Sequence, residues 1–263
     1  MERSISHIRN WKKFLLVSVF CLQPSIFNFP TSICSAQDND FGMWYELGAD
    51  KRLSQHWSVG AEGELRTRNN TRTMDRWSIG LSGTYKINKN LKATGGYTFL
   101  NDNNAEEIDF KKDGITPNKW MPSYWGVRHR FYVGLSGNVD WGRMNISLRE
   151  RWQYTYRPQA DGKKYDFDNE VWKAVKGKGK NILRSRLQLE YNIPHWKLDP
   201  IIGVEMFNDN GGIQKMRYHV GTEYKIQKQH VFSLTYRFQS VNEDDDDGDM
   251  NSHLIGIGYK YKF

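Results

Sequence analysis

Charged side chains recur at every second residue of several stretches, and these residue types could do chemistry. Arg184 and Arg186, for example, alternate with Leu183, Ser185 and Leu187. Arginine is the residue expected for buried, bidentate pairing with carboxylates. The candidate polar cluster consists of Glu62, Glu64, Arg66, Arg76, Arg128, Arg130, Arg149, Arg151, Arg184, Arg186, Glu190, Glu205, Arg217, Glu223 and Arg237. If these side chains share one interior, they either fill it with salt bridges or form a basic constriction that selects anions or acidic solutes.

A second set of residues has the types that hydrolysis requires. A hydrolase places a nucleophilic hydroxyl near a histidine that a carboxylate orients. His219 and Glu223 lie four residues apart on one face of a predicted strand, and Ser233 or Thr235 lies on the next strand. Because alternating polar positions produce such a trio by chance, we expect no catalytic role. A lipid-modifying hydrolase stays open as an alternative.

Metal and cofactor binding have little support in the sequence. No cysteine lies after residue 36, and no two histidines have ligand-like spacing on one strand. The acidic run Glu243–Asp249 resembles the start of a calcium loop, but the closing Glu of that pattern is missing. We therefore expect no metal and no cofactor. The acidic run is interpreted as a solvated loop, and whether it binds a cation stays open.

The last nine residues indicate which elements position these side chains. Ile255, Ile257, Tyr259, Tyr261 and Phe263 occupy one face of the segment, and glycines and lysines occupy the other. A period of two indicates a strand with one apolar face. The segment resembles the closing strand of a Gram-negative outer-membrane β-barrel, in which a terminal aromatic residue is part of the signal that the assembly machinery reads. We therefore expect Tyr259, Tyr261 and Phe263 to serve as an assembly signal.

The same alternation recurs along the chain. It predicts eleven strands, at roughly 42–52, 57–68, 75–87, 91–101, 124–138, 143–157, 182–194, 199–208, 214–227, 231–241 and 252–263. Short turns alternate with longer polar connections, at about 67–75, 101–123, 158–181, 208–214 and 241–252. This arrangement is typical of transmembrane barrels, in which the short turns are periplasmic.

Such strands must close on themselves, because hydrocarbon offers no water to an open sheet edge. The pattern predicts an all-β fold, a transmembrane antiparallel up-and-down β-barrel of about 10–12 strands. Since an odd strand number is unusual for a bacterial single-chain barrel, we expect one of two departures. Either the first strand is split or joined by residues before 42, or it is not a full member of the wall.

The first 36 residues have the pattern of a secretory signal. Basic residues from Arg3 to Lys13 precede the apolar run 14–22, and Cys34-Ser35-Ala36 offers a small residue at both positions of an A-x-A-like cleavage site. An apolar run of this length is too short to span a bilayer. We expect a signal peptide over residues 1–36, which removes both cysteines of the chain, and one outer-membrane β-barrel over residues 37–263.

Several segments resemble those of a known family. They are Gln37–Trp44, Gly60–Arg66, the pair Asp75-Arg76 and Leu183–Tyr191. They look like the family called domain of unknown function 2490, whose members are described as outer-membrane β-barrels, and the likeness runs through about 37–263. The resemblance implies location and architecture, and it brings no activity and no catalytic residues.

These patterns together predict a protein of the cell outer membrane with a structural or narrow-passage function. Because narrow barrels fill with side chains, we expect the polar cluster to be a salt-bridged filling. The alternatives are the lipid-modifying hydrolase and a binding or adhesin barrel that acts through its extracellular loops. Expected partners are outer-membrane lipids and, during biogenesis, the barrel-assembly machinery. Lys and Arg exceed Asp and Glu only by 38 to 30, so we expect no nucleic-acid partner.

Overall fold

The computed structural model describes residues 40–209, 211–227, 229–242 and 251–263, whose regular structure is β-strand. The strands are β1 (Asp40–Arg52), β2 (Trp57–Arg68), β3 (Thr73–Lys86), β4 (Leu91–Asn104), β5 (Glu107–Phe110), β6 (Pro117–Met121), β7 (Tyr124–Trp141), β8 (Met144–Arg157), β9 (Ala160–Asp166), β10 (Val171–Val175), β11 (Lys178–Tyr191), β12 (Leu198–Asp209), β13 (Gly212–Ile226), β14 (His230–Val241) and β15 (Ser252–Lys262). No helix of the described residues is long and apolar enough to cross a membrane. The predicted signal peptide and the acidic run 243–249 lie outside the described residues.

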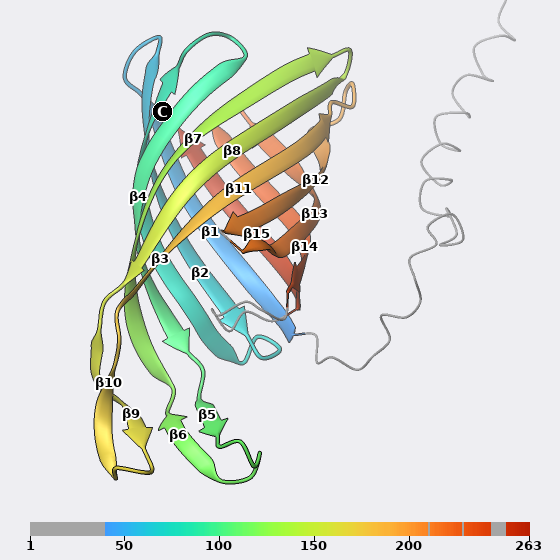
Figure 1. Cartoon of the computed structure of the whole chain (residues 1–263). Helices are drawn as coiled ribbons and strands as arrows, with labels where there is room; N and C mark the ends of the chain where they lie inside the picture. The colour runs from blue at the N-terminus through green and yellow to red at the C-terminus, as the bar shows by residue number, and fades with distance from the viewer. Residues whose placement is uncertain (1–39, 210, 228, 243–250) are drawn as a thin grey trace, which may run out of the picture. The chain divides into compact units, whose positions relative to one another are not determined.

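Eleven of these strands close into a barrel, in the order β1-β15-β14-β13-β12-β11-β8-β7-β4-β3-β2 (Figure 1). They are the eleven strands that the period-two alternation predicts, with ends that differ by at most four residues. The all-β barrel class is therefore confirmed, and the strand number lies within the predicted range. Alternation suffices here because each barrel strand has one mostly apolar and one mostly polar face.

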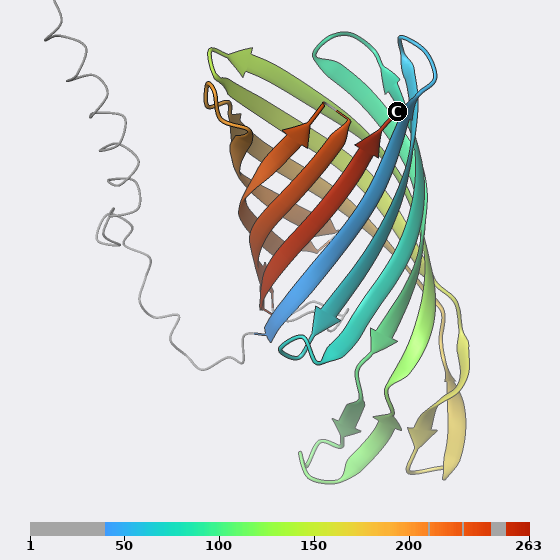
Figure 2. The ribbon, with the colours of Figure 1, turned by 180° about the vertical axis from the view of Figure 1, so that it is seen from behind.

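The barrel closes through a parallel pair of strands. β1 runs beside β15 in the same direction, with partners from Asp40 and Ser252 to Asp50 and Lys262 (Figure 2). The other neighbouring pairs of the barrel are antiparallel, including β1 with β2. An odd number of alternating strands brings the first and last strands together in the same direction. The expectation that the first strand is split or is not a full member of the wall is therefore wrong, because β1 is continuous from Asp40 to Arg52 and pairs along both of its edges. Of the residues before 42 that could have joined it, Asp40 and Phe41 belong to β1, and residues 1–39 lie outside the described residues.

The connections between strands differ in length at the two ends of the barrel. At one end, which we call the short-turn end, the chain turns through residues 53–56, 87–90, 142–143, 192–197 and 227–229. At the opposite, long-connection end, residues 105–123 and 158–177 carry additional strands, and residues 242–251 join β14 to β15. Two connections predicted to be long, 67–75 and 208–214, are short, since the strands extend into them and leave only 69–72 and 210–211.

Four shorter strands form a second sheet, in the order β10-β9-β6-β5. It lies at the long-connection end (Figure 1). One row of register partners crosses all four strands and consists of Ile108, Trp120, Tyr165 and Trp172. The centroids of the Tyr165 and Trp172 rings lie 5.3 Å apart. This sheet is absent from the expectations above, because strands of four to seven residues are too short for alternation to be read.

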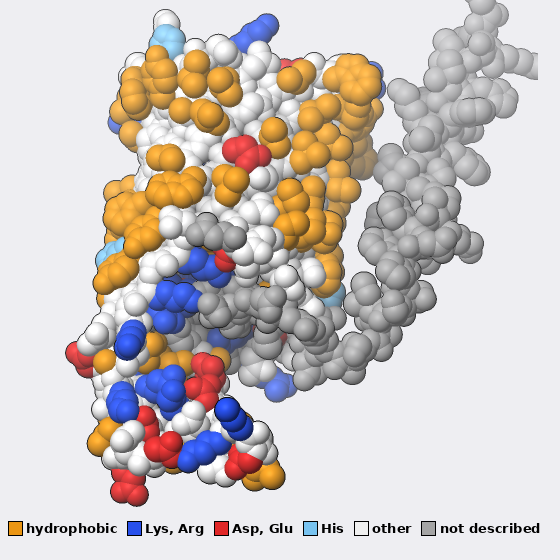
Figure 3. Space-filling view, viewed as in Figure 1, with side chains coloured by type: hydrophobic (Ala, Val, Ile, Leu, Met, Phe, Trp, Pro, Cys, Tyr) orange, Lys and Arg blue, Asp and Glu red, His pale blue; other side chains and the backbone are white. Residues whose placement is uncertain are grey.

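The outer face of the barrel wall is apolar. Large hydrophobic side chains point outward and are exposed, for example Leu47 at 63 %, Leu81 at 62 % and Val220 at 52 %. Figure 3 shows hydrophobic side chains spread over the wall, and Lys, Arg, Asp and Glu gathered toward the second sheet. The polar residues that alternate with these hydrophobic ones therefore point to the interior.

Candidate functional site

Register pairing brings the predicted polar cluster onto one face of the sheet, because partners directly opposite in neighbouring strands share a face. Arg149, Arg186, Glu205 and Arg217 form one continuous row across β8, β11, β12 and β13. On the other side of the barrel, Arg66 of β2 is opposite Arg76 of β3. These positions alternate with the exposed hydrophobic ones, so the row faces the lumen.

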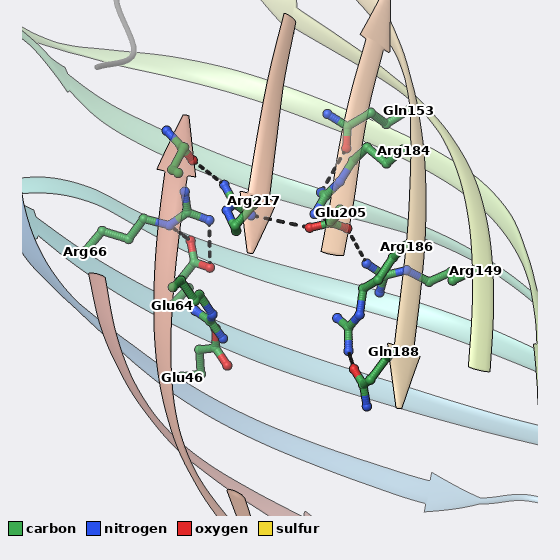
Figure 4. Close-up of polar contacts among 12 residues, drawn as sticks. Glu46, Glu64, Arg66, Arg149, Gln153, Arg184, Arg186, Gln188, Glu205 and Arg217 are labelled. Atoms are coloured by element: carbon green, nitrogen blue, oxygen red, sulfur yellow. Dashed lines mark hydrogen bonds and ion pairs between the residues drawn. The ribbon is translucent and has the colours of Figure 1, made fainter. Parts of the chain in front are cut away.

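Glu205 is the centre of an ion-pair group in the lumen (Figure 4). Its Oε1 lies 2.7 Å from Nη2 of Arg149 and 3.0 Å from Nη2 of Arg184. Its Oε2 lies 3.5 Å from Nη1 of Arg217. Arg217 also donates to Oε1 of Gln239, at 2.6 Å. One nearly fully buried carboxylate thus holds guanidinium groups from three different strands.

Trp44 of β1 is the second centre of the same region. The Arg66 guanidinium lies 3.7 Å from the centroid of the Trp44 ring, and those of Arg237 and Arg217 lie at 4.5 Å and 4.7 Å. Arg217 also approaches the Phe207 ring, at 4.9 Å. Guanidinium groups over aromatic faces are attracted by the ring quadrupole. Because β14 and β15 separate β13 from β1 in the wall, the contact between Arg217 and Trp44 passes over the inner faces of these two strands.

These residues form a cluster that we call the mid-lumen cluster. It consists of Trp44, Glu64, Arg66, Arg149, Arg184, Glu205, Phe207, Arg217 and Arg237. Arg66 is tied to Glu64 by two contacts, at 2.5 Å and 2.9 Å. Arg184 is held by Gln153, at 3.2 Å, as well as by Glu205. The cluster is thus connected from β8 around to β2.

Two local irregularities in the strands help to aim this cluster. The pairing of β2 with β3 shifts register at Arg66 and Thr67, and that of β12 with β13 shifts at Phe207 and Asn208. Such shifts bend a strand and redirect its side chains. Beside the first shift, a Cβ on Gly42 would lie only 2.3 Å from the carbonyl oxygen of Thr67. Glycine at 42 therefore allows β1 to approach β2 closely, two residues before Trp44.

Two other acids pair with three further arginines of the predicted cluster, Arg76, Arg128 and Arg237. Asp102 accepts a bidentate pair from Arg76 and lies 2.8 Å from Nε of Arg128. Glu46 lies 2.9 Å from Nη2 of Arg237. Asp102 and Glu46 are absent from the predicted cluster. The alternation could have identified both, because Asp102 follows Thr98 and Leu100 on one face of β4, and Glu46 shares a face with Trp44.

Nearer the short-turn end, the lumen holds an arrangement of opposite sign, which we call the short-turn cluster. Nζ of Lys225 lies 2.8 Å from Glu190, 3.0 Å from Asp199 and 3.4 Å from Glu223. Glu190 and Glu223 belong to the predicted cluster, and Lys225 and Asp199 do not. The partner of Glu190 is therefore a lysine, and the expectation that these acids pair with arginine is wrong at this level of the barrel.

Four members of the predicted cluster have no oppositely charged side chain within 4 Å among the described residues. They are Glu62, Arg130, Arg151 and Arg186. Arg130 lies 3.3 Å from the Thr155 hydroxyl, and Arg186 bonds Gln188. The lumen thus holds more guanidinium groups than carboxylates at mid-height.

The residues that could have formed a hydrolase site, His219, Glu223, Ser233 and Thr235, do not form a catalytic arrangement in the described structure. No hydrogen bond there joins His219 to Glu223, Ser233 or Thr235, and Nε2 of His219 is buried without a partner. The His219 ring lies against the backbone of Gly203, where a Cβ would come within 2.6 Å of Nε2. His219 therefore covers a glycine instead of activating a hydroxyl. No group of three or more potential metal ligands occurs within the described ranges.

The terminal aromatic residues predicted to be an assembly signal lie on the outer face of β15 and just after it. The Tyr261 and Phe263 rings pack edge to face, with centroids 4.5 Å apart. Tyr259 bonds Nδ1 of His230 on β14, at 2.9 Å. The backbone N–H of Phe263 donates to the carbonyl of Asp50 on β1, at 2.8 Å, so the chain end is tied across the parallel seam.

Comparison with known proteins gives a family and a similarity in fold to solved structures. Residues 41–251 match the family described as Protein of unknown function (DUF2490). The crystal structure of the beta domain of the Bordetella autotransporter BrkA is similar to this chain, with a TM-score of 0.49 and 10 % sequence identity. That similarity covers 77 % of this chain and 79 % of the other. No curated protein matches the chain.

Proposed function

Because this chain belongs to the DUF2490 family of proteins of unknown function and folds into a closed β-barrel, we propose that it is an outer-membrane β-barrel whose lumen is closed at mid-height by its own side chains. Its role is structural or that of a narrow passage. The observation that carries this proposal is the contact of Arg217 on β13 with Trp44 on β1, which reaches over two intervening strands inside the lumen, 4.7 Å from guanidinium carbon to ring centroid.

The outer face of the wall supports a place in a membrane. Exposed side chains such as Ile79 at 58 %, Val133 at 56 % and Leu234 at 54 % form an apolar surface around the barrel. Apolar patches of this extent are unusual on soluble monomers. A closed barrel also pairs the backbone groups of its wall, which hydrocarbon demands. The short-turn end then faces the periplasm, and the second sheet faces the exterior.

The interior supports a restricted passage. At mid-height Trp44 and Glu205 are only 6 % and 4 % exposed, which means that side chains surround them on all sides. Closer to the short turns the lumen is wider, because Glu62 points inward and is nevertheless exposed. Solutes therefore reach the mid-lumen cluster from the short-turn end and meet a constriction there.

Single-channel recording in planar bilayers tests this proposal. We expect the wild-type protein to show a small conductance, well below that of an open porin, and Trp44→Ala to raise it. Tyr45→Ala is the matched control, because Tyr45 is the next residue on β1 and points to the lipid face. A large, steady wild-type conductance that Trp44→Ala leaves unchanged would contradict the proposal.

The proposed partners are outer-membrane lipids and, during biogenesis, the barrel-assembly machinery. The terminal aromatic residues Tyr259, Tyr261 and Phe263 support the second, since they follow one another along the outer face at the end of the last strand, and Phe263 is 66 % exposed. Phe263→Asp should lower the yield of heat-modifiable protein in the outer-membrane fraction. Asp161→Asn, a change in the second sheet, should not. Recovery of wild-type protein from the soluble periplasmic fraction would refute the location itself.

One observation favours a second candidate function, binding through the extracellular connections. The row of Ile108, Trp120, Tyr165 and Trp172 gives the second sheet an aromatic face, on which Trp172 is 51 % exposed. Aromatic side chains are enriched at recognition surfaces. Adhesion of intact cells to glycan-coated or protein-coated surfaces should fall with Trp172→Ala if this function exists. Equal adhesion of cells that carry the wild-type protein and cells that carry Trp172→Ala would exclude this binding function.

A further inference from the structure

The lumen contains four arginines on two neighbouring strands with a single carboxylate, that of Glu205, within 4 Å of any of them among the described residues. We propose that these residues, Arg149, Arg151, Arg184 and Arg186, form a binding site for a phosphate-type oxyanion. We call them the basic quartet. The inference rests on the proposed function in one respect, namely that the quartet faces a water-filled lumen that solutes enter from the short-turn end.

The pairing of β8 with β11 places like charges directly opposite one another. Arg149 is the register partner of Arg186, and Arg151 is the register partner of Arg184. Directly opposite residues on one face have Cβ atoms only about 4.5–5.5 Å apart, and like charges there destabilise the sheet. Two such pairs in succession are a feature that packing alone does not require. An anion between them would convert the repulsion into attraction.

The protein supplies too little negative charge of its own at this place. Glu205 bonds Arg149 and Arg184, and it is shared with Arg217 of β13. Arg151 and Arg186 have no carboxylate within 4 Å in the described part of the chain. The Arg151 guanidinium lies 4.2 Å from the centroid of the Tyr132 ring, and Arg186 bonds the side chain of Gln188. Two guanidinium groups therefore keep donors available toward the lumen.

The chemistry of the quartet fits a phosphate group. Each guanidinium presents several N–H donors in a fixed plane, a geometry that matches phosphate oxygens in pairs. A phosphate group carries close to two negative charges at neutral pH and three strong acceptor oxygens, more than one carboxylate offers. Neutral donors also line the site, because Ser136 of β7 is the register partner of Arg149.

Isothermal titration of the full-length, detergent-refolded protein with inorganic phosphate and pyrophosphate, in chloride buffer, tests the proposal. We expect saturable binding by the wild-type protein. Arg186→Gln and Arg151→Gln should each weaken it about tenfold or more, since a charge-assisted hydrogen bond contributes at least that factor. Arg143→Gln is the matched control, because Arg143 lies in the turn between β7 and β8, outside the lumen.

Thermal unfolding of the same variants separates a binding role from a structural one. Without phosphate, Arg186→Gln should unfold at the same temperature as the wild type or higher, because the substitution removes repulsion from Arg149. Phosphate should raise the unfolding temperature of the wild type and of Arg143→Gln, and it should have little effect on Arg186→Gln. A simple structural role for Arg186 predicts the reverse, a less stable variant with an unchanged response to phosphate.

The outcomes distinguish this inference from the proposed function. Equal phosphate binding by wild type, Arg186→Gln and Arg151→Gln would overturn the site, and so would tighter binding of citrate than of phosphate. A small wild-type conductance without phosphate binding would refute the inference and leave the proposed closure standing. A large, steady conductance would refute the closure whether or not phosphate binds.

Discussion

Two places in the lumen are built from opposite charges in the same pattern. At mid-height, Glu205 accepts ion pairs from Arg149, Arg184 and Arg217. Near the short turns, Lys225 bonds three carboxylates. The difference lies in exposure, since the side chain of Glu205 is 5 % exposed and that of Lys225 is 37 % exposed. One arrangement is enclosed by side chains, and the other is reached by solvent.

This difference teaches that ion pairing alone does not close a lumen. Solvated ion pairs contribute little stability, typically about 0–1 kcal/mol, and leave room for water. The mid-height arrangement differs because Trp44 and Phe207 lie beneath its guanidinium groups. Aromatic rings displace water and add attraction to the cations above them. We therefore attribute the closure of the lumen to its aromatic and arginine side chains together. The short-turn cluster lies in the part of the lumen that solvent reaches.

The largest effect is expected from removing the central acid of the enclosed cluster. Glu205→Gln keeps the shape of the side chain but leaves Arg149, Arg184 and Arg217 without their shared counter-charge. Breaking a buried ion pair from one side costs about 3–5 kcal/mol. Glu190→Gln is the matched change in the solvated cluster, and it should cost less than about 1 kcal/mol. Urea unfolding in lipid vesicles measures both, and equal losses would remove the distinction between the two clusters.

A smaller effect tests whether the two faces of the wall are assigned correctly. An arginine on the lipid face at the bilayer midplane costs roughly 2–4 kcal/mol. Leu81→Arg should therefore lose that amount, whereas Ser82→Arg, one residue along on the lumen face, should be milder. Folding yield in lipid vesicles reports the difference. If both variants fold equally well, the clusters compared above do not face a common lumen.

The smallest effect is expected at the centre of the solvated cluster. Lys225→Met leaves Glu190, Asp199 and Glu223 without their shared cation, yet water and counter-ions screen them. We expect a loss of at most about 1 kcal/mol in the free energy of unfolding. A higher salt concentration should reduce it further. A loss as large as that of Glu205→Gln, insensitive to salt, would show that this end of the lumen is enclosed as well.

Much of the fold follows from the sequence because a barrel wall repeats one simple rule. Inward and outward residues alternate, so segments such as 57–68 are predicted to the residue. The parallel seam does not follow from that rule, since β1 and β15 are distant in sequence and alternation carries no information on direction. The second sheet is missed for a different reason. Its row from Ile108 to Trp172 takes only one residue from each short strand, so no alternation within a strand reveals it.

The candidate site is predictable in composition and less so in its connections. Alternation places Arg184, Arg186 and Glu205 on one face without a structure. It does not show that Glu205 serves three arginines, because those contacts depend on the register between strands. Trp44 is missed for a similar reason. In a strand of this kind, an aromatic residue more often faces the lipid. Glu46 and Gly48 lie two and four residues after Trp44, on the same face of β1, and only they indicate that this face points to the lumen.

Accessibility of single cysteines tests closure at mid-height most directly. The described residues contain no cysteine, so one can be placed on each side of the mid-lumen cluster. Glu62→Cys lies toward the short turns, and Val241→Cys lies at the long-connection end of the lumen. In vesicles of uniform orientation, a small impermeant thiol reagent should modify Glu62→Cys only from the short-turn side and Val241→Cys only from the opposite side. Modification of both from either side would contradict the closed lumen.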